Sequence, residues 1–295
     1  AALYLLGDFA YVNGAWSPGL ARFNGAALTP MLGGNVGGHT LLEAEFDGQS
    51  RLFIGGQFNS FGTPNSRAIV EYGADGFDRL GGGVKDHGFN GTVTALGAAG
   101  GVVYAGGDFD SASGQSARKI AQFGGFAFPG IGGLNYQGVG GSARVNAIRG
   151  FGDDLIIGGR FNLANGVAVS NITAWDGADF RNIGSGGLFL AMELVDLGQG
   201  ALLYIAHDTL QGSYNWRVWD GLTLDAPGFP LLNHETRAVA QFDDGSGAGP
   251  ALIAGGKFTA SGATTLRHLG AWRAGDAQWT EIGGGVVGGD INAMA

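Results

Sequence analysis

The sequence predicts an all-β chain built as a ring of six repeated, four-stranded sheets. Three observations predict this fold. A Gly-Gly-x-Phe segment recurs about every fifty residues, no segment shows a helical period, and the two chain ends together spell one more copy of the repeat. A ring of radially arranged, four-stranded antiparallel sheets is a β-propeller, so the fold class expected is a six-bladed β-propeller.

Each repeat is expected to contain four short strands joined by turns. Its most recognisable strand ends in the glycine pair, and its copies are LYLLGDF (3–9), LFIGGQF (52–58), VVYAGGDF (102–109), LIIGGRF (155–161), LIAGGKF (252–258) and the divergent LYIAHDT (203–209). A strand such as VTAL (93–96) comes before it, and strands such as ITAW (172–175) and a segment ending in LGG, IGG or IGS follow. Pairs such as Asp176-Gly177 and Asp220-Gly221 favour the positive φ angles of two-residue hairpins.

The two chain ends predict how the ring closes. The C-terminal INAMA followed by the N-terminal AALYLLGDF matches VTALGAAGGVVYAGGDF in order. The C-terminal strand is therefore expected to be the innermost strand of the N-terminal blade, which protects the sheet edges. The blades of this single domain, 1–295, are predicted at approximately 40–90, 91–142, 143–187, 188–233, 234–288, and 289–295 together with 1–39.

Glycine inside a strand loses backbone entropy and contributes no side chain to the core. Its recurrence, in a chain with sixty glycines, needs a structural reason. Blades converge toward a central axis, where glycine lets neighbouring backbones approach closely, and the following Phe is expected to insert between blades. We interpret Gly-Gly-x-Phe as a structural motif.

Composition excludes several classes of function. A net charge of −9 argues against nucleic-acid binding, which requires a basic face. No apolar stretch is long enough to span a membrane, and the absence of cysteine excludes disulfides, thiolate metal sites and a cysteine nucleophile. The numbered chain contains no signal peptide but starts abruptly at Ala1, as a processed precursor would. These features favour an extracellular, periplasmic or cell-surface bacterial protein.

The segments LFIGGQF…AIVEY…LGGGV and LIIGGRF…ITAWDG…IGSGG resemble the kelch-like repeats of cell-surface proteins of the Rax2 and delta-60 type. The resemblance extends over nearly the whole chain. It implies a repeat β-propeller that is extracellular or associated with the cell wall, and it implies no catalytic site. The fourth blade departs from this pattern.

Charged residues follow the glycine pairs at equivalent positions. In blade order they alternate in sign after the first, uncharged member, Gln57, and they are Asp108, Arg160, Asp208, Lys257 and Asp8. Neighbouring blades would place Asp108 near Arg160 and Lys257 near Asp8. We interpret the set as a structural belt of inter-blade ion pairs, with a ligand-binding rim as the alternative.

A second set of equivalent positions is expected to line the central channel. It occupies the variable position of the innermost strands: Glu43, Thr94, Asn146, Arg237 and Asn292. The set holds only one acid, whereas glycoside hydrolysis needs two carboxylates and a calcium site needs several oxygen ligands. We therefore expect a water-filled channel, no catalytic residues and no metal ligands.

The fourth blade offers the candidate binding site. It has lost the glycine pair and the Phe, and its outer end is the proline-containing segment DAPGFPLLNHETR (225–237). The loop face of this blade is expected to present His207, Tyr214, Trp216, Phe229 and His234. Aromatic side chains with a few polar groups suit sugar stacking or a protein interface. We nevertheless favour the interpretation that this blade is a decayed repeat whose core is repacked with larger side chains, and we keep the binding site as the alternative.

The function expected from the sequence is a non-catalytic binding or scaffold propeller that engages another protein, or a larger surface assembly, through its loop face. A carbohydrate-binding propeller is the alternative. A polysaccharide-active enzyme is less favoured and would depend on Glu43, Arg237 or His207. No cofactor, nucleic-acid partner or membrane span is expected.

Overall fold

The computed structural model describes most of the chain. The described residues are 3–6, 11–12, 15–23, 28–31, 37–46, 48–61, 66–73, 76–78, 89, 91–124, 129–138, 142–209, 213–243 and 247–282. These residues form strands and turns and contain no helix, so the all-β expectation is confirmed for them. Accordingly, none of the described segments is an apolar helix long enough to cross a membrane.

The long strands form antiparallel sheets in which spatial order follows chain order. In one of them β6 (Gly38–Phe46) pairs with β7 (Gln49–Gly56), β7 with β8 (Ile69–Gly73), and β8 with β9 (Gly76–Asp78). The first and last steps are tight hairpins, as the turn signals in the sequence predict, whereas residues 57–68 separate β7 from β8. Gly177 and Gly221 have the expected positive φ angles, 99° and 101°. The two-residue hairpins predicted for these Asp-Gly pairs are wrong, because Trp175 pairs with Phe180 and Trp219 with Leu224 across four-residue loops.

The same order recurs along the chain. Three further four-stranded sheets are β16 (Arg144–Phe151), β17 (Asp154–Arg160), β20 (Ile172–Trp175), β21 (Phe180–Arg181); β22 (Leu188–Asp196), β23 (Ala201–Thr209), β24 (Ser213–Trp219), β25 (Leu224–Asp225); and β26 (Thr236–Phe242), β27 (Ala251–Gly256), β30 (Leu269–Trp272), β31 (Thr280–Glu281). Two sheets show three strands within the described residues: β10 (Thr92–Ala99), β11 (Val102–Asp108), β14 (Ile120–Gln122), and β1 (Leu3–Leu6), β4 (Leu20–Phe23), β5 (Leu28–Pro30).

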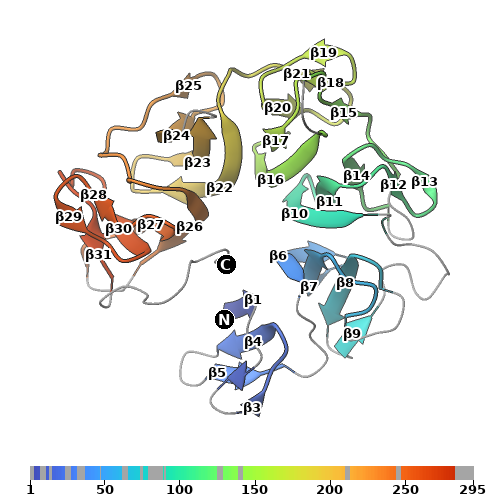
Figure 1. The fold of residues 1–295 in the computed structure, drawn as a ribbon, viewed down its shortest axis with the longest axis horizontal. Helices are drawn as coiled ribbons and strands as arrows, with labels where there is room; N and C mark the ends of the chain where they lie inside the picture. The colour runs from blue at the N-terminus through green and yellow to red at the C-terminus, as the bar shows by residue number, and fades with distance from the viewer. Residues whose placement is uncertain are drawn as a thin grey trace.

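These sheets follow one another around a common axis, each with its first strand toward the centre (Figure 1). The inner strands β6, β10, β16, β22 and β26 contact one another in that sequence, and β1 contacts β6. Antiparallel pairing within each sheet places the start of every inner strand beside the end of the following strand. We call the face on which the inner strands begin the mouth face.

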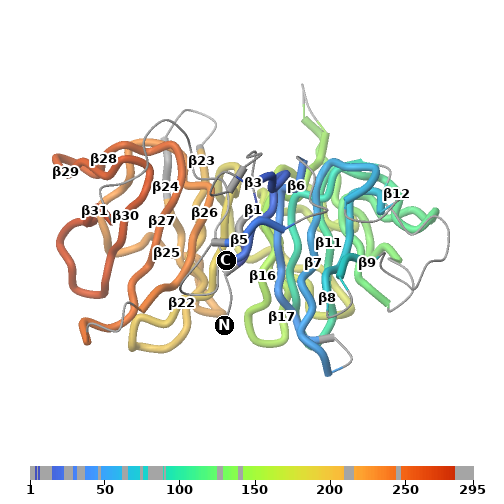
Figure 2. The backbone as a smooth tube through the Cα atoms, turned by 90° about the horizontal axis from the view of Figure 1, so that it is seen from below, coloured from blue at the N-terminus to red at the C-terminus, as the bar shows by residue number. Residues whose placement is uncertain are grey.

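Short hairpins between the second and third strands extend the mouth face. They are formed by β2 (Tyr11–Val12) and β3 (Ala15–Trp16), β12 (Ser111–Ala112) and β13 (Gln115–Ser116), β18 (Leu163–Ala164) and β19 (Val167–Ala168), and β28 (Ala260–Ser261) and β29 (Thr264–Thr265); β15 (Leu134–Asn135) pairs with β18. In the side view β12 and β28 lie toward the same side of the molecule (Figure 2). The turns that join third and fourth strands lie on the opposite face.

The glycine pairs have two separate packing roles. A Cβ on the first glycine would meet the next sheet: it would lie 2.5 Å from Val93 Cγ1 at Gly55 and 2.5 Å from Val145 Cγ1 at Gly106. A Cβ on the second glycine would meet backbone of its own sheet, 2.0 Å from Thr92 O at Gly107. The first glycine therefore permits sheet-on-sheet packing, and the second permits close approach of the inner strand.

The phenylalanines that follow the glycine pairs fill the space between sheets. Phe109, Phe161 and Phe258 are buried, in three different apolar clusters that each span neighbouring sheets. Full burial of such a side chain contributes about 1.5–3 kcal/mol. The inserted position expected for this Phe is confirmed at these three residues.

The N-terminal sheet begins with β1, although the other long sheets begin with an inner strand. Its order, β1-β4-β5, corresponds to the second, third and fourth strands of its neighbours. The inner strand predicted for it, 291–294, lies outside the described residues. Closure by strand exchange and a total of six blades therefore stay predictions.

Candidate functional site

Five sheets share a β-bulge near the start of the inner strand. In the β10–β11 pair, Val93 lies opposite Gly107 and Ala95 opposite Gly106, so Thr94 has no partner in the ladder. The other four sheets break register at the same place. The bulged residues are His39, Thr94, Asn146, Leu190 and Arg237. A bulge redirects one side chain, and bulges are over-represented at functional sites.

All five bulged residues line one central cavity of about 490 Å³. Below them lies a ring of small residues, Thr40, Ala95, Ala147, Ala191 and Ala238, followed by Leu41, Leu96, Ile148, Met192 and Val239. We call the five bulged residues the bulge ring and the cavity they line the central cavity. Its volume is that of an ordinary small-molecule pocket.

The structure changes the predicted channel lining at one position. Thr94, Asn146 and Arg237 line the central cavity, as expected. Glu43 is exposed, accepts a hydrogen bond of 2.7 Å from Ser50 Oγ, and is not among the lining residues; His39 takes the equivalent place. The prediction for Glu43 was wrong because the register was assigned four residues too far along β6. Asn292 lies outside the described residues.

Two members of the bulge ring join neighbouring sheets. Thr94 Oγ1 donates to Val145 O of β16, and Asn146 Nδ2 donates to Phe189 O of β22 at 2.9 Å. Each donor therefore pairs with the residue that precedes the bulge in the next sheet. The leucine side chain of Leu190 has no hydrogen-bond donor, so the fourth sheet cannot make this side-chain hydrogen bond to the next sheet.

The cavity lining is basic. It includes Arg144, Arg149 and Arg237, and the described lining contains no aspartate or glutamate. Arg149 pairs with Glu193 of the neighbouring sheet, and burial raises the pKa of Glu193 despite that pair. Arg237 Nη2 lies 2.8 Å from Glu235 Oε2.

Glu235 also pairs with Lys257, whose Nζ lies 3.4 Å from Glu235 Oε2. Burial raises the pKa of Glu235, but the hydrogen bond and charge of Arg237 and the charge of Lys257 outweigh it, so the pKa is lowered. The predicted partner of Lys257, Asp8, lies outside the described residues. Lys257 thus pairs within its own sheet, next to the mouth of the cavity.

Asp108 likewise pairs within its own sheet. Its Oδ1 lies 2.9 Å from Lys119 Nζ, and Asp110 holds the same buried ammonium at 3.0 Å. Burial lowers the pKa of Lys119, but the two carboxylates together raise it. The prediction that Asp108 serves an inter-blade pair is therefore corrected: it neutralises a lysine of its own sheet.

The remaining charges of the predicted belt have different surroundings. The guanidinium of Arg160 lies over the ring of Tyr136, 4.7 Å from its centroid. Within the described part of the chain, the buried Oδ1 of Asp208 has no hydrogen-bond partner. Burial raises the pKa of Asp208, and the nearby charge of Glu235 raises it further.

Two aromatic residues of the predicted fourth-blade site are in the core. Trp216 is 2% exposed and Phe229 6% exposed, and both pack against Trp279 of the next sheet with ring centroids 6.0 and 5.3 Å away. Stacking a sugar requires an accessible ring face, and neither residue offers one. The structure thus favours the repacked-core alternative for this pair.

His207 replaces the second glycine of the motif and is also buried, at 3% exposure. Its Nδ1 accepts a hydrogen bond from Gly187 N at 3.3 Å, and its buried Nε2 has no partner among the described residues. Burial, assisted by the charge of Arg217, lowers the pKa of His207 to about 4. His234 is half-buried, and its Nδ1 accepts from Glu235 N. The Tyr214 side chain lies outside the described part of the structure.

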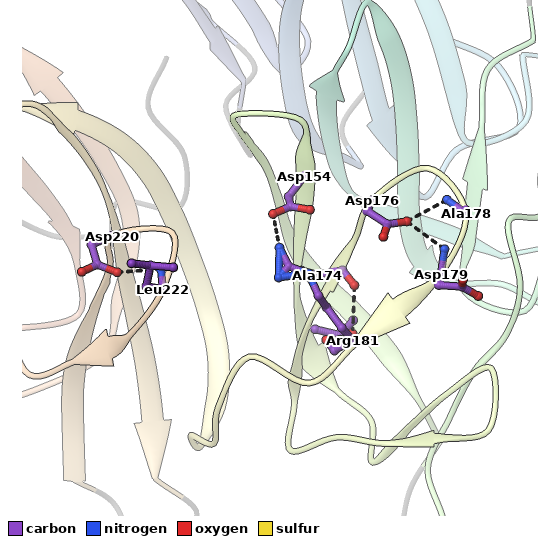
Figure 3. A network of polar contacts seen from close by, with 9 residues as sticks. Asp154, Ala174, Asp176, Ala178, Asp179, Arg181, Asp220 and Leu222 are labelled. Atoms are coloured by element: carbon purple, nitrogen blue, oxygen red, sulfur yellow. Dashed lines mark hydrogen bonds and ion pairs between the residues drawn. The ribbon is translucent and has the colours of Figure 1, made fainter.

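The opposite face is rich in carboxylates that shape turns. Asp176 Oδ1 accepts from the backbone N of Ala178 and Asp179, both at 2.9 Å, and Asp220 Oδ1 accepts from Leu222 N at 2.7 Å (Figure 3). Backbone N–H donors lower the pKa of both carboxyls. Asp154 pairs with Arg181 on the same face (Figure 3). Asp176 and Asp220 are Asx-turn residues.

A second cavity of about 370 Å³ lies between the fourth and fifth sheets. Tyr204 of β23 and Trp272 of β30 line it, together with the turn residue Asp276. Trp272 Nε1 donates to Asp276 O at 2.9 Å. Neither cavity contains a metal-binding group, because the described residues hold no cluster of three or more His, Asp or Glu suited to a metal ion.

Comparison with known proteins identifies no family. No protein-family model and no curated protein sequence matches the chain. Among solved structures, the chain is similar to "Dihydro-heme d1 dehydrogenase NirN in complex with DHE", at 9% identity and a TM-score of 0.48, over 95% of this chain and 53% of that one. This chain therefore spans about half the length of that protein, and the likeness carries no inference about function.

Among the residues of the central cavity that sequence reasoning missed are His39, Leu190, Arg144 and Arg149. A signal for the first two was present. Each bulged residue is followed by a small residue and then an aliphatic one, as in His39-Thr40-Leu41 and Leu190-Ala191-Met192. The two arginines lie two residues before and three after Asn146, and no repeat pattern marks them.

Proposed function

We propose that the chain is a six-bladed, kelch-like β-propeller in which the C-terminal strand, 291–294, completes the N-terminal sheet. The support is the order β1-β4-β5, which lacks the strand that every neighbouring long sheet places before its second strand. INAM matches VNAI, so Asn292 would take the bulge position that Asn146 occupies. The blade boundaries are those given by the repeat.

A disulfide formed between engineered cysteines tests the closure. By equivalence with Ile148 and Ile157, which are register partners, Met294 would lie opposite Leu5. The variant Met294→Cys/Leu5→Cys should oxidise to an intramolecular disulfide in a chain that has no other cysteine. In the control, Met294→Cys/Leu3→Cys, the Cα atoms would be too far apart. Equal oxidation of both variants, or of neither, would refute the register.

We propose further that this propeller is a non-catalytic, extracellular binding scaffold whose mouth face engages an acidic surface of another protein. One observation carries this proposal. Arg67, Arg118 and Arg267 are exposed at equivalent places before the third strand of three sheets, with φ angles of 30°, 30° and 36°. Positive φ is costly for a residue with a Cβ and is concentrated at functional positions, and arginine is enriched in interfaces.

Affinity capture from the extracellular fraction of the native host tests the partner proposal. The bait is the full chain, compared with the variant Arg67→Ser/Arg118→Ser/Arg267→Ser. The control, Arg51→Ser/Arg181→Ser/Arg273→Ser, removes the same charge from the opposite face. A specific partner should be lost with the first variant and kept with the control. Partners that both triple variants retain would rule out this face.

A further inference from the structure

The mouth of the central cavity combines positive charge with an apolar wall. Arg144 and Arg237 line the cavity on the sheets on either side of the one that carries Leu190. The whole chain has 25 acidic and 16 basic side chains, yet none of the described lining residues is acidic. A cavity of one sign in an acidic protein concentrates ligands of the opposite charge.

Arg144 is the guanidinium best placed to meet a ligand. It is exposed, it lines the central cavity, and the described part of the chain gives it no ion pair. Its register partner across the β16–β17 ladder is Arg160, another cation. Like charges opposite each other are destabilising, and a bound anion would relieve that repulsion.

Arg149 and Arg237 differ from Arg144 because each has a carboxylate partner. Glu193 pairs with Arg149 and Glu235 with Arg237. These pairs fix the two side chains without adding a carboxylate to the described wall. These two ion pairs hold the guanidinium groups in place but offset most of their charge, so the uncompensated positive charge of the described wall is that of Arg144.

Leu190 adds the apolar part. It is the one aliphatic member among the described bulge-ring residues, and the bulged residues of the two neighbouring sheets are Asn146 and Arg237. The Ala191 and Met192 that follow it also line the cavity. A ligand held by a guanidinium would thus meet carbon on the adjacent sheet.

We propose that the mouth of the central cavity is a binding site for a small organic carboxylate, with the carboxylate on Arg144 and Arg237 and an apolar group on Leu190. A guanidinium binds a carboxylate through two parallel hydrogen bonds, which gives both strength and orientation. The site is independent of the protein partner proposed for the outer mouth face, since Arg67, Arg118 and Arg267 do not line the cavity.

Isothermal titration at constant ionic strength tests the site, with benzoate as the probe and benzamide as its uncharged counterpart. Benzoate should bind with one-to-one stoichiometry, and benzamide should not. Arg144→Gln should weaken benzoate binding at least tenfold, because it removes charge without breaking an ion pair in the described chain. The matched control, Arg118→Gln, makes the same charge change on the same face outside the cavity and should leave binding unchanged.

Two further arms identify what the site recognises. Leu190→Asn should weaken benzoate more than acetate, since only benzoate has a ring to lose contact with Leu190. Inorganic phosphate should bind more weakly than benzoate. No saturable binding of benzoate up to about 10 mM, equal losses in Arg144→Gln and Arg118→Gln, or tighter binding of phosphate would each overturn the proposal. Failure of these titrations would leave the affinity-capture result unaffected, and the reverse also holds.

Discussion

Replacing the second glycine of a pair by alanine should destabilise the protein more than replacing a glycine elsewhere in a strand. In Gly107→Ala the new Cβ would lie 2.0 Å from Thr92 O and 3.0 Å from Thr94 N. Ordinary contacts between such atoms are about 3.5 Å, so β10 and β11 would have to separate locally by more than about 1 Å. Both obstacles are backbone atoms at the bulge, and no side chain can rotate away to relieve the clash.

The expected cost is about 3 kcal/mol, the upper part of the range for overpacking a dense core. Gly106→Ala should cost less, because its Cβ would meet the side chains of Val145 and Ile148, which can adjust. Gly73→Ala is the control: nothing lies within 4 Å of its added Cβ. There the loss of unfolded-state entropy should leave stability unchanged or raise it by up to about 1 kcal/mol.

Urea denaturation of the three variants, followed by tryptophan fluorescence, gives the free energies of unfolding. The order expected for stability is Gly73→Ala, then Gly106→Ala, then Gly107→Ala. A Gly107→Ala protein as stable as Gly73→Ala would refute the account of the glycine pair as a close backbone approach. The same test applies at Gly56, Gly159 and Gly256, whose added Cβ atoms would lie 2.1, 2.1 and 2.2 Å from backbone oxygens.

Three other predictions concern the fourth sheet and the bulge ring. Burial lowers the pKa of His207 to about 4 in the folded protein, whereas its ordinary value in the unfolded chain is near 6.5. As the pH falls, the unfolded chain therefore binds a proton on this histidine before the folded protein does. The free energy of unfolding should fall by about 3 kcal/mol between pH 6.5 and pH 4. Urea unfolding midpoints measured across this pH range should depend less on pH in His207→Gln than in the unmodified protein, and should keep the original dependence in His268→Gln. Trp216→Ala should lower the free energy of unfolding by about 3–5 kcal/mol, whereas Leu222→Ala, at 85% exposure, should change it by less than about 0.5 kcal/mol; equal effects would contradict burial of the indole. Asn146→Ala should lower the free energy of unfolding by about 1–3 kcal/mol in the same assay, since it removes the donor to the Phe189 carbonyl of β22. A negligible change would show that this hydrogen bond between the two sheets does not contribute to stability.

The repeat could be predicted from the sequence because its glycine pairs, aromatic positions and turn dipeptides recur at nearly fixed spacing. Strand order within each sheet followed from the turns, and the buried Phe109 and Phe161 followed from their places in the repeat. The bulge could not be predicted so easily. It adds one residue to the inner strand and marks the position that enters the cavity, and the repeat position assigned without it was Glu43, four residues beyond the bulged His39.

The sequence left the fourth blade open between a binding site and a repacked core, for a different physical reason. Loss of the glycine pair and addition of large aromatic residues are equally compatible with an exposed site and with a refilled core. Composition cannot separate the two, because the outcome depends on the neighbouring sheet. Trp279 of the last described sheet packs against Trp216 and Phe229 and encloses them, and nothing in the sequence near Trp216 indicates that contact.

The bulge ring separates the part of each repeat that must stay constant from the part that is free to vary. The residues before and after the bulge are paired with the two glycines of the second strand, and these must stay small because the inner strand passes close to the second glycine. The bulged residue itself has no ladder partner, and its side chain faces the cavity, so backbone packing does not restrict its chemistry. The five described sheets place His39, Thr94, Asn146, Leu190 and Arg237 at this position. Two of these residues donate hydrogen bonds to the neighbouring sheet, and the others give the cavity wall its charged and apolar parts. Substitution at this position can therefore change the binding properties of the cavity and leave the sheet geometry intact.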